Sequence, residues 1–230
     1  MTKVFCDIAD INLIKKFNKK NIVKGFTTNP SLMRKAGAKD YKNYSRQILK
    51  ITNKPVSLEV FDDNEKGMIT QGLKISKWGR NVYVKVPVTN SKGKFMGKVI
   101  KKLNKEKIKL NITAVYTFEQ VKKIIKCLNK NSKSIISIFA GRMADKGKDP
   151  MPIFKKSITK TKKYNNIEIL WASTREPYNF LQAKKIKCNI ITMPPSIIEK
   201  ISSFGKSYKD LTIDTVKGFL NDSQKSKFKI

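Results

Sequence analysis

The sequence predicts an α/β protein, a (β/α)8 TIM barrel that forms a single domain over residues 1–230. Strand-like runs occur eight times, with amphipathic helical patterns filling most of the gaps between them. Several of these runs place aliphatic side chains on one face and a polar group on the other. The length of 230 residues is close to the roughly 250 typical of such a barrel. The runs begin near Val4, Ile22, Val56, Val82, Ile108, Ser134, Ile167 and Asn189.

The early strands already show this two-faced pattern. In the run 4–8 the aliphatic residues share a face with Cys6, whereas Asp7 lies on the other face with Phe5. In the run 55–60, Glu59 points away from the aliphatic face. This pattern suits a parallel barrel whose outer strand face packs on helices and whose inner face carries a site near the strand ends.

Two later strands repeat the pattern. In the run 110–114, Asn111 and Thr113 oppose the apolar positions, and in the run 136–139 Ser137 opposes two isoleucines. Each of these strands therefore presents at least one hydrogen-bonding group on the face that we expect to line the barrel.

Lys85 is a lone cation in the apolar run 82–87. A lysine in a buried strand is paired with an anion, held in its neutral form, or used in a reaction, because burying an unpaired ammonium is costly. A neutral lysine is a nucleophile that can form a Schiff base with a carbonyl substrate. From this segment alone, an edge strand with an outward lysine that guards against aggregation is the favoured interpretation.

Helix-start signals follow two of the strands. Asn29-Pro30-Ser31 and the segment 193–196 place proline and a small polar residue at a strand-to-helix turn. Residues 207–230 are expected to form a C-terminal helical extension beyond the eighth unit. Its apolar face could cover the barrel or dock onto a neighbouring subunit, and it consists of Leu211, Val216, Phe219 and Leu220.

The formal net charge of +33 favours contact with nucleic acid or an anionic membrane surface. However, the lysines are spread over nearly every expected helix beside apolar residues, and arginine is scarce. A specific nucleic-acid surface would favour arginine for its bidentate phosphate contacts. We therefore expect a solvated outer surface and no specific nucleic-acid partner, although the field can attract small phosphorylated anions.

Composition excludes several kinds of chemistry. The chain has no histidine, so proton transfers must use carboxylates, lysine, tyrosine or water. Cys6, Cys127 and Cys188 have no metal-type spacing, and we expect reduced core cysteines and no metal. No apolar run approaches the roughly 20 residues that cross a bilayer, and the chain enters a strand without a signal-peptide core. We expect a cytoplasmic protein that has no membrane partner.

Seven segments, in order along the chain, resemble those of the transaldolase family, particularly the short forms related to fructose-6-phosphate aldolase. The most specific are TTNPSL at 27–32 and VKVP at 84–87, which occur in the expected order. The others are FCD at 5–7, SLEV at 57–60, NITAV at 111–115, SIFAGR at 137–142 and ASTR at 172–175.

The resemblance implies roles for four residues in catalysis. Lys85 matches the lysine that holds the dihydroxyacetone unit as a Schiff base. Asp7 matches the acid/base that takes the proton from the donor C4 hydroxyl. Glu59 and Thr113 match the pair that holds a water used in proton shuttling. These four are the expected catalytic residues, and the resemblance implies no metal and no organic cofactor.

Six further residues match substrate-binding positions of the family. Asn29 and Asn111 match amides that hydrogen-bond the dihydroxyacetone hydroxyls, with Ser137 close by. Taken alone, Asn29 before Pro30 favours a residue that starts a turn. The phosphate-binding positions of the family are matched by Arg142, Ser173 and Arg175.

The chain also departs from the family pattern. The first strand continues Asp7-Ile8-Ala9-Asp10 where the family usually has Asp-Thr-Ala-Asn, so a small hydrogen bond near Asp7 is expected to be missing. In relatives that are free aldolases, a glutamine matches Glu59 and a tyrosine matches Phe139. This chain has the transferase-like residue at both positions.

The resemblance implies a transaldolase of the pentose phosphate pathway. Such an enzyme transfers a dihydroxyacetone unit from sedoheptulose 7-phosphate or fructose 6-phosphate to glyceraldehyde 3-phosphate or erythrose 4-phosphate. The alternatives are a fructose-6-phosphate aldolase that releases free dihydroxyacetone, and a basic nucleic-acid-binding protein on a barrel scaffold. The expected partners are sugar-phosphate substrates and other copies of the chain in a homo-oligomer.

Overall fold

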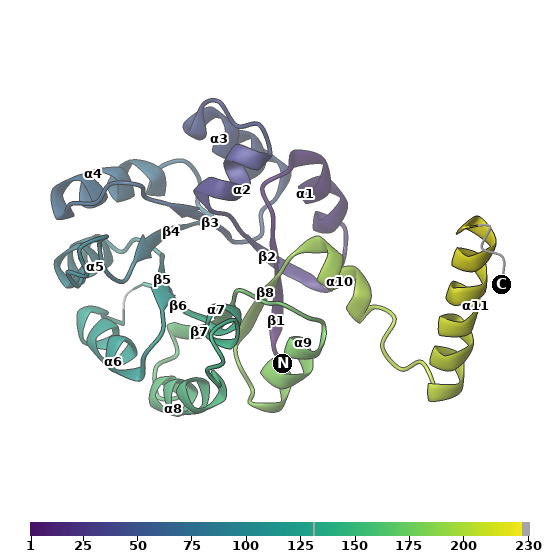
Figure 1. Ribbon diagram of the computed structural model, residues 1–230. Helices are drawn as coiled ribbons and strands as arrows, with labels where there is room; N and C mark the ends of the chain where they lie inside the picture. The colour runs from purple at the N-terminus through teal and green to yellow at the C-terminus, as the bar shows by residue number, and fades with distance from the viewer. Residues whose placement is uncertain (131, 227–230) are drawn as a thin grey trace.

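The computed structural model describes residues 1–130 and 132–226 and shows a closed barrel of eight parallel strands (Figure 1). The strands are β1 Lys3–Asp7, β2 Val23–Thr27, β3 Val56–Glu59, β4 Val82–Pro87, β5 Leu110–Val115, β6 Ser134–Phe139, β7 Ile167–Ala172 and β8 Ile190–Met193. All eight begin within two residues of the predicted positions, so the predicted (β/α)8 barrel is confirmed.

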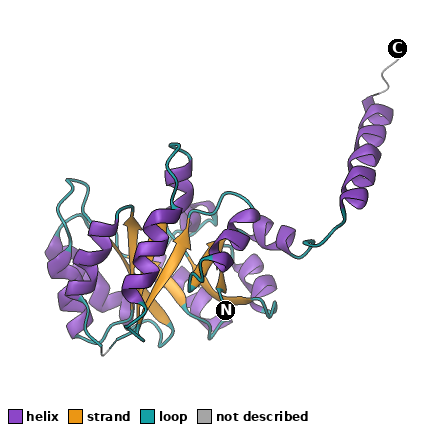
Figure 2. Cartoon of the chain, turned by 90° about the horizontal axis from the view of Figure 1, so that it is seen from below, coloured by secondary structure: helices purple, strands orange, loops and turns teal. Residues whose placement is uncertain are grey.

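Helices follow the strands and form the outer layer of the barrel (Figure 2). They are α1 Ile11–Asn18, α2 Pro30–Lys35, α3 Tyr41–Ile51, α4 Glu65–Ser76, α5 Gly97–Lys105, α6 Phe118–Cys127, α7 Ala140–Ala144, α8 Met151–Thr161, α9 Tyr178–Lys185, α10 Pro195–Ile201 and α11 Tyr208–Ser226. Both predicted proline starts are confirmed, since α2 begins at Pro30 and α10 at Pro195.

The main hydrophobic core lies between the strands and the helices. Val4 and Cys6 of β1 belong to it, as the alternation in the sequence predicts. In this layer, Trp171 of β7 stacks on Phe154 of α8 with ring centroids 4.5 Å apart. Burial of each such large side chain contributes about 1.5–3 kcal/mol, so this layer accounts for much of the stability of the barrel.

A second, smaller apolar cluster fills the inside of the barrel. Its members come from strands on opposite sides, and Phe139 packs against it. The cluster consists of Phe5, Tyr83, Ile135, Leu170, Ala172 and Ile190. These inward residues close the interior, as is usual for barrels of eight strands.

The register of the strands brings predicted site residues next to one another. Glu59 at the end of β3 is the direct partner of Lys85 in β4, and Lys85 is in turn the partner of Asn111 in β5. On the other side of the barrel, Asp7 pairs with Thr27 of β2. Side chains that are far apart in the sequence therefore meet at the carboxyl end of the barrel.

Helix α11 stands apart from the barrel (Figures 1 and 2). The predicted C-terminal helix is confirmed over Tyr208–Ser226, and residues 227–230 of the predicted extension lie outside the described part of the chain. The helix does not cover its own barrel, since none of the described residues of α11 is buried. Its apolar side chains face outward, and Phe219 is 69% exposed. Of the two alternatives left by the sequence, coverage of the same chain is wrong.

No helix within residues 1–130 and 132–226 is long and apolar enough to span a membrane.

Candidate active site

Lys85 is buried inside the barrel and has two polar partners. Its Nζ lies 3.1 Å from Glu59 Oε2 and donates a hydrogen bond to the Thr28 carbonyl oxygen at 3.0 Å. Only 8% of Lys85 is exposed. Since a closed barrel has no edge strand, the interpretation of Lys85 as an edge guard is wrong. The lysine is a paired group on the inner face.

Glu59 is held in place by Tyr41, the first residue of α3. The Tyr41 hydroxyl accepts a hydrogen bond from the Glu59 backbone N–H at 2.9 Å and donates to the Glu59 carbonyl oxygen at 3.1 Å. Burial raises the pKa of Tyr41, so the phenol keeps its proton and can donate. Tyr41 thus fixes the end of β3 and, with it, the carboxylate that faces Lys85.

Asp7 belongs to a hydrogen-bonded series of hydroxyls. Thr27 Oγ1 donates to Asp7 Oδ1 at 2.6 Å and lies 2.6 Å from Thr192 Oγ1. When Asp7 is ionised it can only accept, so the single hydrogen of Thr27 goes to Asp7 and Thr192 donates to Thr27. Thr27 therefore supplies a hydrogen bond to Asp7 despite the departure from the family pattern at Ile8.

Burial raises the pKa of the Asp7 carboxyl above its usual value of 3.8. The hydrogen bond from Thr27 and the positive charge of Lys85 act in the opposite direction, because both favour the ionised form. A carboxyl with a raised pKa in a polar cavity is suited to general acid/base chemistry, since it takes up a proton more readily than an ordinary aspartate and can return it.

Asn111 of β5 forms hydrogen bonds with a serine of β3 and a serine of β6. Its Nδ2 donates to Ser57 Oγ at 3.0 Å, and its Oδ1 accepts from Ser137 Oγ at 2.6 Å. All three residues are buried. These contacts fix which side of the amide is the donor, so Asn111 and Ser137 present a defined hydrogen-bonding pattern to a bound molecule.

Thr113 lies at the end of β5, where the strand is irregular. The pairing of β5 with β6 shifts between Ile112 and Val115, and Ala114 has a φ of 58°. Such irregularities redirect side chains near binding sites. The Thr113 hydroxyl is buried and has no hydrogen-bond partner within the described chain, so it is suited to bind a water or a substrate hydroxyl.

Asn29 caps a helix, and its role in binding a substrate stays a prediction. Its Oδ1 accepts a hydrogen bond from the Leu32 N–H at 2.9 Å, which caps the N-terminus of α2. Asn29 also lines the cavity described next. The cap uses the oxygen, so the Nδ2 group is the end of the side chain that can donate to a ligand.

A cavity of about 190 Å³ opens at the carboxyl end of the barrel. Nine of the ten predicted site residues line it, whereas Glu59 does not line it and reaches the site through Lys85. The wall consists of Asp7, Thr27, Asn29, Lys85, Asn111, Thr113, Ser137, Phe139, Arg142, Leu170, Ala172, Ser173, Arg175 and Thr192.

The two predicted phosphate arginines lie on one side of this cavity, after consecutive strands. Arg142 is in α7, directly after β6, and its guanidinium lies 5.6 Å from the centre of the Phe139 ring. Arg175 follows β7 and is paired with Asp145. Ser173 lies between β7 and Arg175 with a φ of 63°, a conformation that is uncommon for serine.

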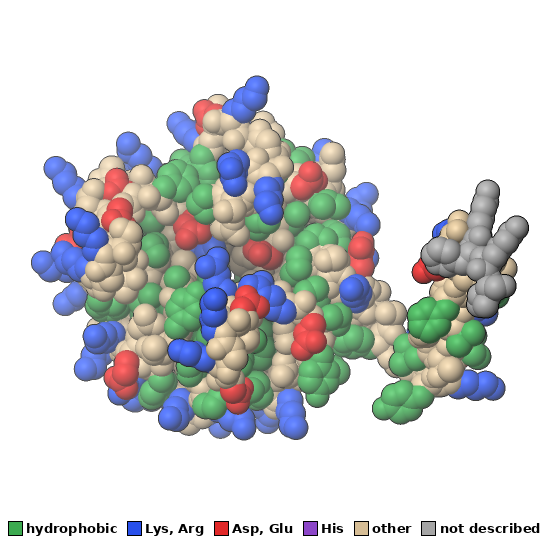
Figure 3. All heavy atoms as spheres, viewed as in Figure 1, with side chains coloured by type: hydrophobic (Ala, Val, Ile, Leu, Met, Phe, Trp, Pro, Cys, Tyr) green, Lys and Arg blue, Asp and Glu red, His purple; other side chains and the backbone are tan. Residues whose placement is uncertain are grey.

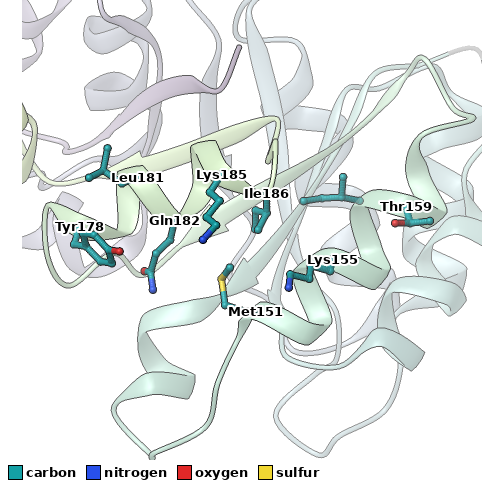
Figure 4. A pocket seen from close by; sticks show the side chains of 9 residues that line it. Met151, Lys155, Thr159, Tyr178, Leu181, Gln182, Lys185 and Ile186 are labelled. Atoms are coloured by element: carbon teal, nitrogen blue, oxygen red, sulfur yellow. The ribbon is translucent and has the colours of Figure 1, made fainter.

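A larger groove of about 540 Å³ lies between α8 and α9, away from these residues (Figure 4). Its walls carry Tyr178 and Leu181, which are 60% and 41% exposed, together with Lys155 and Lys185. It contains no carboxylate and none of the predicted site residues, so size alone does not identify the reactive site.

The site can carry out carbonyl chemistry with the groups that line it. A lysine can attack a carbonyl carbon, a carboxyl can move protons, and amides and hydroxyls can hold a polyhydroxylated chain. Two arginines at the rim suit a phosphate. Within the described residues no group of three or more Cys, Asp or Glu side chains could hold a metal ion.

Thr192, Tyr41 and Thr27 belong to the site but were not predicted from the sequence. Thr192 sits among aliphatic residues in β8, where a threonine is typical of a buried strand. Tyr41 begins a helix, and its contact with Glu59 depends on how α3 packs against β3. Thr27 stands in TTNPSL, and its position opposite Asp7 in the register is the signal that could have identified it.

The fold and site define a (β/α)8 barrel with a lysine-containing polar cavity at the carboxyl end of its strands. The family model for Transaldolase/Fructose-6-phosphate aldolase matches residues 4–230. The chain belongs to this family and is an enzyme of it.

Curated relatives support this membership along nearly the whole chain. One from Nitrosopumilus maritimus, named "Probable transaldolase", is 35% identical over 227 residues, covering 98% of this chain and 96% of its own. One from Thermoanaerobacter sp., with the same name, is 31% identical over 229 residues, covering 99% of this chain and 100% of its own.

Solved structures share the fold with little sequence similarity. A putative phosphonomutase from Burkholderia cenocepacia matches with a TM-score of 0.59 at 7% identity, over 96% of this chain and 94% of its own. An N-acetylneuraminate lyase from Mycoplasma synoviae matches with a TM-score of 0.57 at 8% identity, over 83% and 68%. At such low sequence identities, these structures show a shared fold and carry no information about function.

Proposed function

We propose that this protein is a transaldolase that moves a dihydroxyacetone unit between sugar phosphates through a Schiff base on Lys85. The observation that carries the proposal is the placement of Lys85, which lies buried on the cavity wall 3.1 Å from Glu59 Oε2. The pair shares this cavity with Asp7 and with a set of amides and hydroxyls that suits a sugar.

In the first half of the reaction, Lys85 Nζ attacks the C2 carbonyl of a ketose phosphate, a C–N bond forms and water leaves. Glu59 moves protons to and from the nitrogen and oxygen of the carbinolamine, with the Thr113 hydroxyl holding the water involved. Asp7 then takes the proton of the C4 hydroxyl, the C3–C4 bond breaks, and an aldose phosphate departs. The electron pair of that bond stays on the lysine-bound three-carbon unit as an enamine.

In the second half, the enamine carbon attacks the aldehyde of a different aldose phosphate, and Asp7 returns its proton to the new hydroxyl. Hydrolysis of the Schiff base then releases the product ketose. Asn29, Asn111 and Ser137 hold the hydroxyls of the bound unit. No oxidant or reductant is required, and the protein supplies every proton acceptor. In this role the enzyme would act in the pentose phosphate pathway.

Arg142 and Arg175 bind the phosphate of the donor and of the acceptor in this proposal. Both lie on the cavity wall, after the consecutive strands β6 and β7. Arginine is notable here because only five of the 50 basic residues in the chain are arginines. Phosphate binding far from the reacting carbons orients the sugar for reaction.

The test is reduction with borohydride in the presence of fructose 6-phosphate, followed by intact mass and peptide mapping. We expect one dihydroxyacetone-derived adduct per chain, located at Lys85. Lys85→Arg should abolish the adduct, because a guanidinium does not become a neutral nucleophile. Lys54→Arg is the matched control, since burial lowers the pKa of Lys54 and this lysine lies outside the cavity. Adducts spread over many lysines would contradict the proposal.

We also propose that the protein assembles with copies of itself through α11. The helix leaves its apolar side chains exposed and carries three aspartates and three lysines, in a chain with a net charge of +33. A neutral helix can approach the basic surface of another copy without adding repulsion. Light scattering of the full chain and of Phe219→Ser should show an oligomer that the substitution weakens; a monomeric full chain would contradict the proposal.

A further inference from the structure

Arg175 is bound by a carboxylate that the reaction scheme does not use. Its Nε donates to Asp145 Oδ1 at 3.0 Å and to Oδ2 at 3.1 Å, and its Nη2 donates to Oδ2 at 2.5 Å. Among the ion pairs of the described residues, this is the one made by an arginine. The other pairs use lysine, whose ammonium does not fix an orientation in the same way.

Both partners are anchored by their backbones. The Asp145 N–H donates to the Gly141 carbonyl oxygen at 2.8 Å, which ties Asp145 to the end of α7. The Arg175 N–H donates to Asn179 Oδ1 at 3.0 Å, which ties Arg175 to the first turn of α9. The side chains therefore meet between two fixed backbone positions, in the bidentate geometry in which an arginine–carboxylate pair is most effective.

The two segments also touch at a second point. A Cβ atom on Gly141 would lie 1.6 Å from the Ser173 carbonyl oxygen, so only glycine fits there. Ser173 has a φ of 63° at this contact. The turn that carries Arg142 and the loop that carries Arg175 are thus held together by a backbone contact and by an ion pair.

Arg175 belongs to the cavity wall and its carboxylate partner, Asp145, does not. A guanidinium has five N–H donors, and the carboxylate engages only the Nε–H and one Nη2–H. Among the described residues 1–130 and 132–226, no acceptor bonds the edge formed by Nη1 and the second Nη2 hydrogen, and this edge can make a second bidentate contact.

We propose that Asp145 is a positioning residue of the phosphate site: it holds Arg175 by its Nε edge so that the outer edge faces the phosphate of the substrate. This inference rests on the proposed function, in which Arg175 binds phosphate. The carboxylate touches neither the substrate nor the reacting atoms.

The negative charge of Asp145 repels a phosphate. Asp145 can therefore favour phosphate binding only if the orientation that it gives to Arg175 outweighs this repulsion. Asp145 is ionised at neutral pH, because the hydrogen bond from Arg175 lowers its pKa below the usual 3.8. Arg142 is a second positive charge close to the carboxylate. Removing the charge of Asp145 would make the local potential more positive, which favours phosphate. Removing its contact with Arg175 would leave the arginine side chain flexible, so that the phosphate would have to order it at a cost in entropy.

The experiment measures the affinity of the full chain for inorganic phosphate by titration calorimetry and the KM and kcat for fructose 6-phosphate with erythrose 4-phosphate. Asp145→Ala should raise the Kd for phosphate and the KM about tenfold, the loss expected for a charge-assisted contact, with kcat little changed. For Asp145→Asn, the Kd and KM should lie between those of the parent and those of Asp145→Ala, because the amide oxygen can still accept a hydrogen bond from Arg175 Nε.

Glu199→Gln is the matched control. It removes a similarly exposed ion pair, with Lys16 at 2.8 Å, on α10 and α1 away from the cavity. Neither phosphate affinity nor KM should change in this variant. Thermal unfolding of all variants separates a folding defect from a binding defect, since the loss of a half-exposed ion pair costs only about 1 kcal/mol or less.

Phosphate binding by Asp145→Ala that equals or exceeds that of the parent would overturn the inference, because the carboxylate would then only repel. Arg175→Ala distinguishes a failure of the positioning role from a failure of the phosphate site itself. If Arg175→Ala weakens phosphate binding and Asp145→Ala does not, the positioning role is wrong and the phosphate site stands. If Arg175→Ala has no effect, the phosphate site itself is wrong. Should Asp145→Ala fail to fold, Asp145→Asn carries the same comparison.

Discussion

Glu59 and Lys85 are direct register partners on neighbouring strands, and their charged atoms meet at 3.1 Å inside the barrel. Their side chains are only 17% and 10% exposed. In such a pair, desolvation and attraction nearly cancel, whereas removal of one partner leaves a buried charge without compensation. The pair is thus a sensitive point for both stability and reactivity.

Removing one charge of this pair should destabilise the protein more than removing both. Glu59→Gln leaves a buried ammonium and is expected to cost about 3 kcal/mol, whereas Lys85→Met together with Glu59→Gln should recover part of that loss. Urea unfolding of the two single variants and the double variant gives the coupling. Additive losses would show that the two charges do not interact.

Asp7→Asn is expected to trade activity for stability. Because burial raises the pKa of Asp7, ionised Asp7 lowers the free energy of unfolding at any pH above its ordinary value of 3.8. The variant should therefore be more stable than the parent at pH 7, and the difference should vanish as the pH falls toward 4.

Urea unfolding at the two pH values tests this, while transfer activity should fall by about 100-fold or more, as is typical when a general acid/base is removed. Equal stability of Asp7→Asn and the parent at pH 7 would show that burial does not perturb the carboxyl.

Phe139→Tyr should shift the reaction from transfer toward cleavage. Phe139 lines the cavity and cannot donate a proton, so the enamine should persist until an aldose acceptor arrives. Fructose 6-phosphate alone should then release little dihydroxyacetone, and erythrose 4-phosphate should give rapid formation of sedoheptulose 7-phosphate. The variant should raise the ratio of cleavage to transfer.

Tyr116→Phe is the control for this experiment. The Tyr116 ring packs 5.8 Å from that of Phe139 but does not line the cavity, so its phenol should not affect the ratio. Fast release of dihydroxyacetone by the unmodified protein without an acceptor would favour the aldolase alternative.

Gly141→Ala should damage the phosphate site from a distance. The added methyl group would collide with the Ser173 carbonyl oxygen and force apart the segments that carry Arg142 and Arg175. We expect a loss of about 1–3 kcal/mol in stability and a weaker affinity for inorganic phosphate. Gly218→Ala, where nothing lies within 4 Å, is the control. Unchanged phosphate affinity in Gly141→Ala would mean that the two segments act independently.

Binding to DNA or RNA should depend on salt and not on sequence. Figure 3 shows lysine and arginine side chains spread over the visible face rather than gathered in one patch. Such a surface binds phosphates by counterion release, so affinity should fall steeply between about 50 and 200 mM salt. Arg142→Ala should leave this binding nearly unchanged while weakening the use of fructose 6-phosphate. Tight binding to one sequence at physiological salt would favour the nucleic-acid alternative.

Much of the fold could be predicted because the relevant signals are local. Alternation along each strand separates Asp7, Asn111 and Ser137 from the aliphatic residues that pack on the helices. In a parallel barrel, all strand ends meet at the same rim, so such residues converge without any knowledge of their distances. The resemblance added Arg142 and Arg175, which no alternation identifies.

The remaining features depend on packing that no short segment encodes. Thr192 meets Thr27 only because β8 closes on β1, and Tyr41 meets Glu59 only because of how α3 lies against the barrel. The ion pair of Asp145 joins two turns that are 30 residues apart in sequence. The position of α11 could not be predicted either, since an amphipathic pattern does not specify what covers it.

The apolar cluster inside the barrel makes the cavity a dead end. Leu170 and Ala172 belong both to that cluster and to the cavity wall, so the cluster forms the floor. Every molecule that arrives or departs must use the same mouth. In a two-substrate reaction here, the first product has to clear the mouth before the second substrate can reach Lys85. For the proposed transfer, we therefore expect an alternating, ping-pong order, in which the first aldose leaves before the second enters.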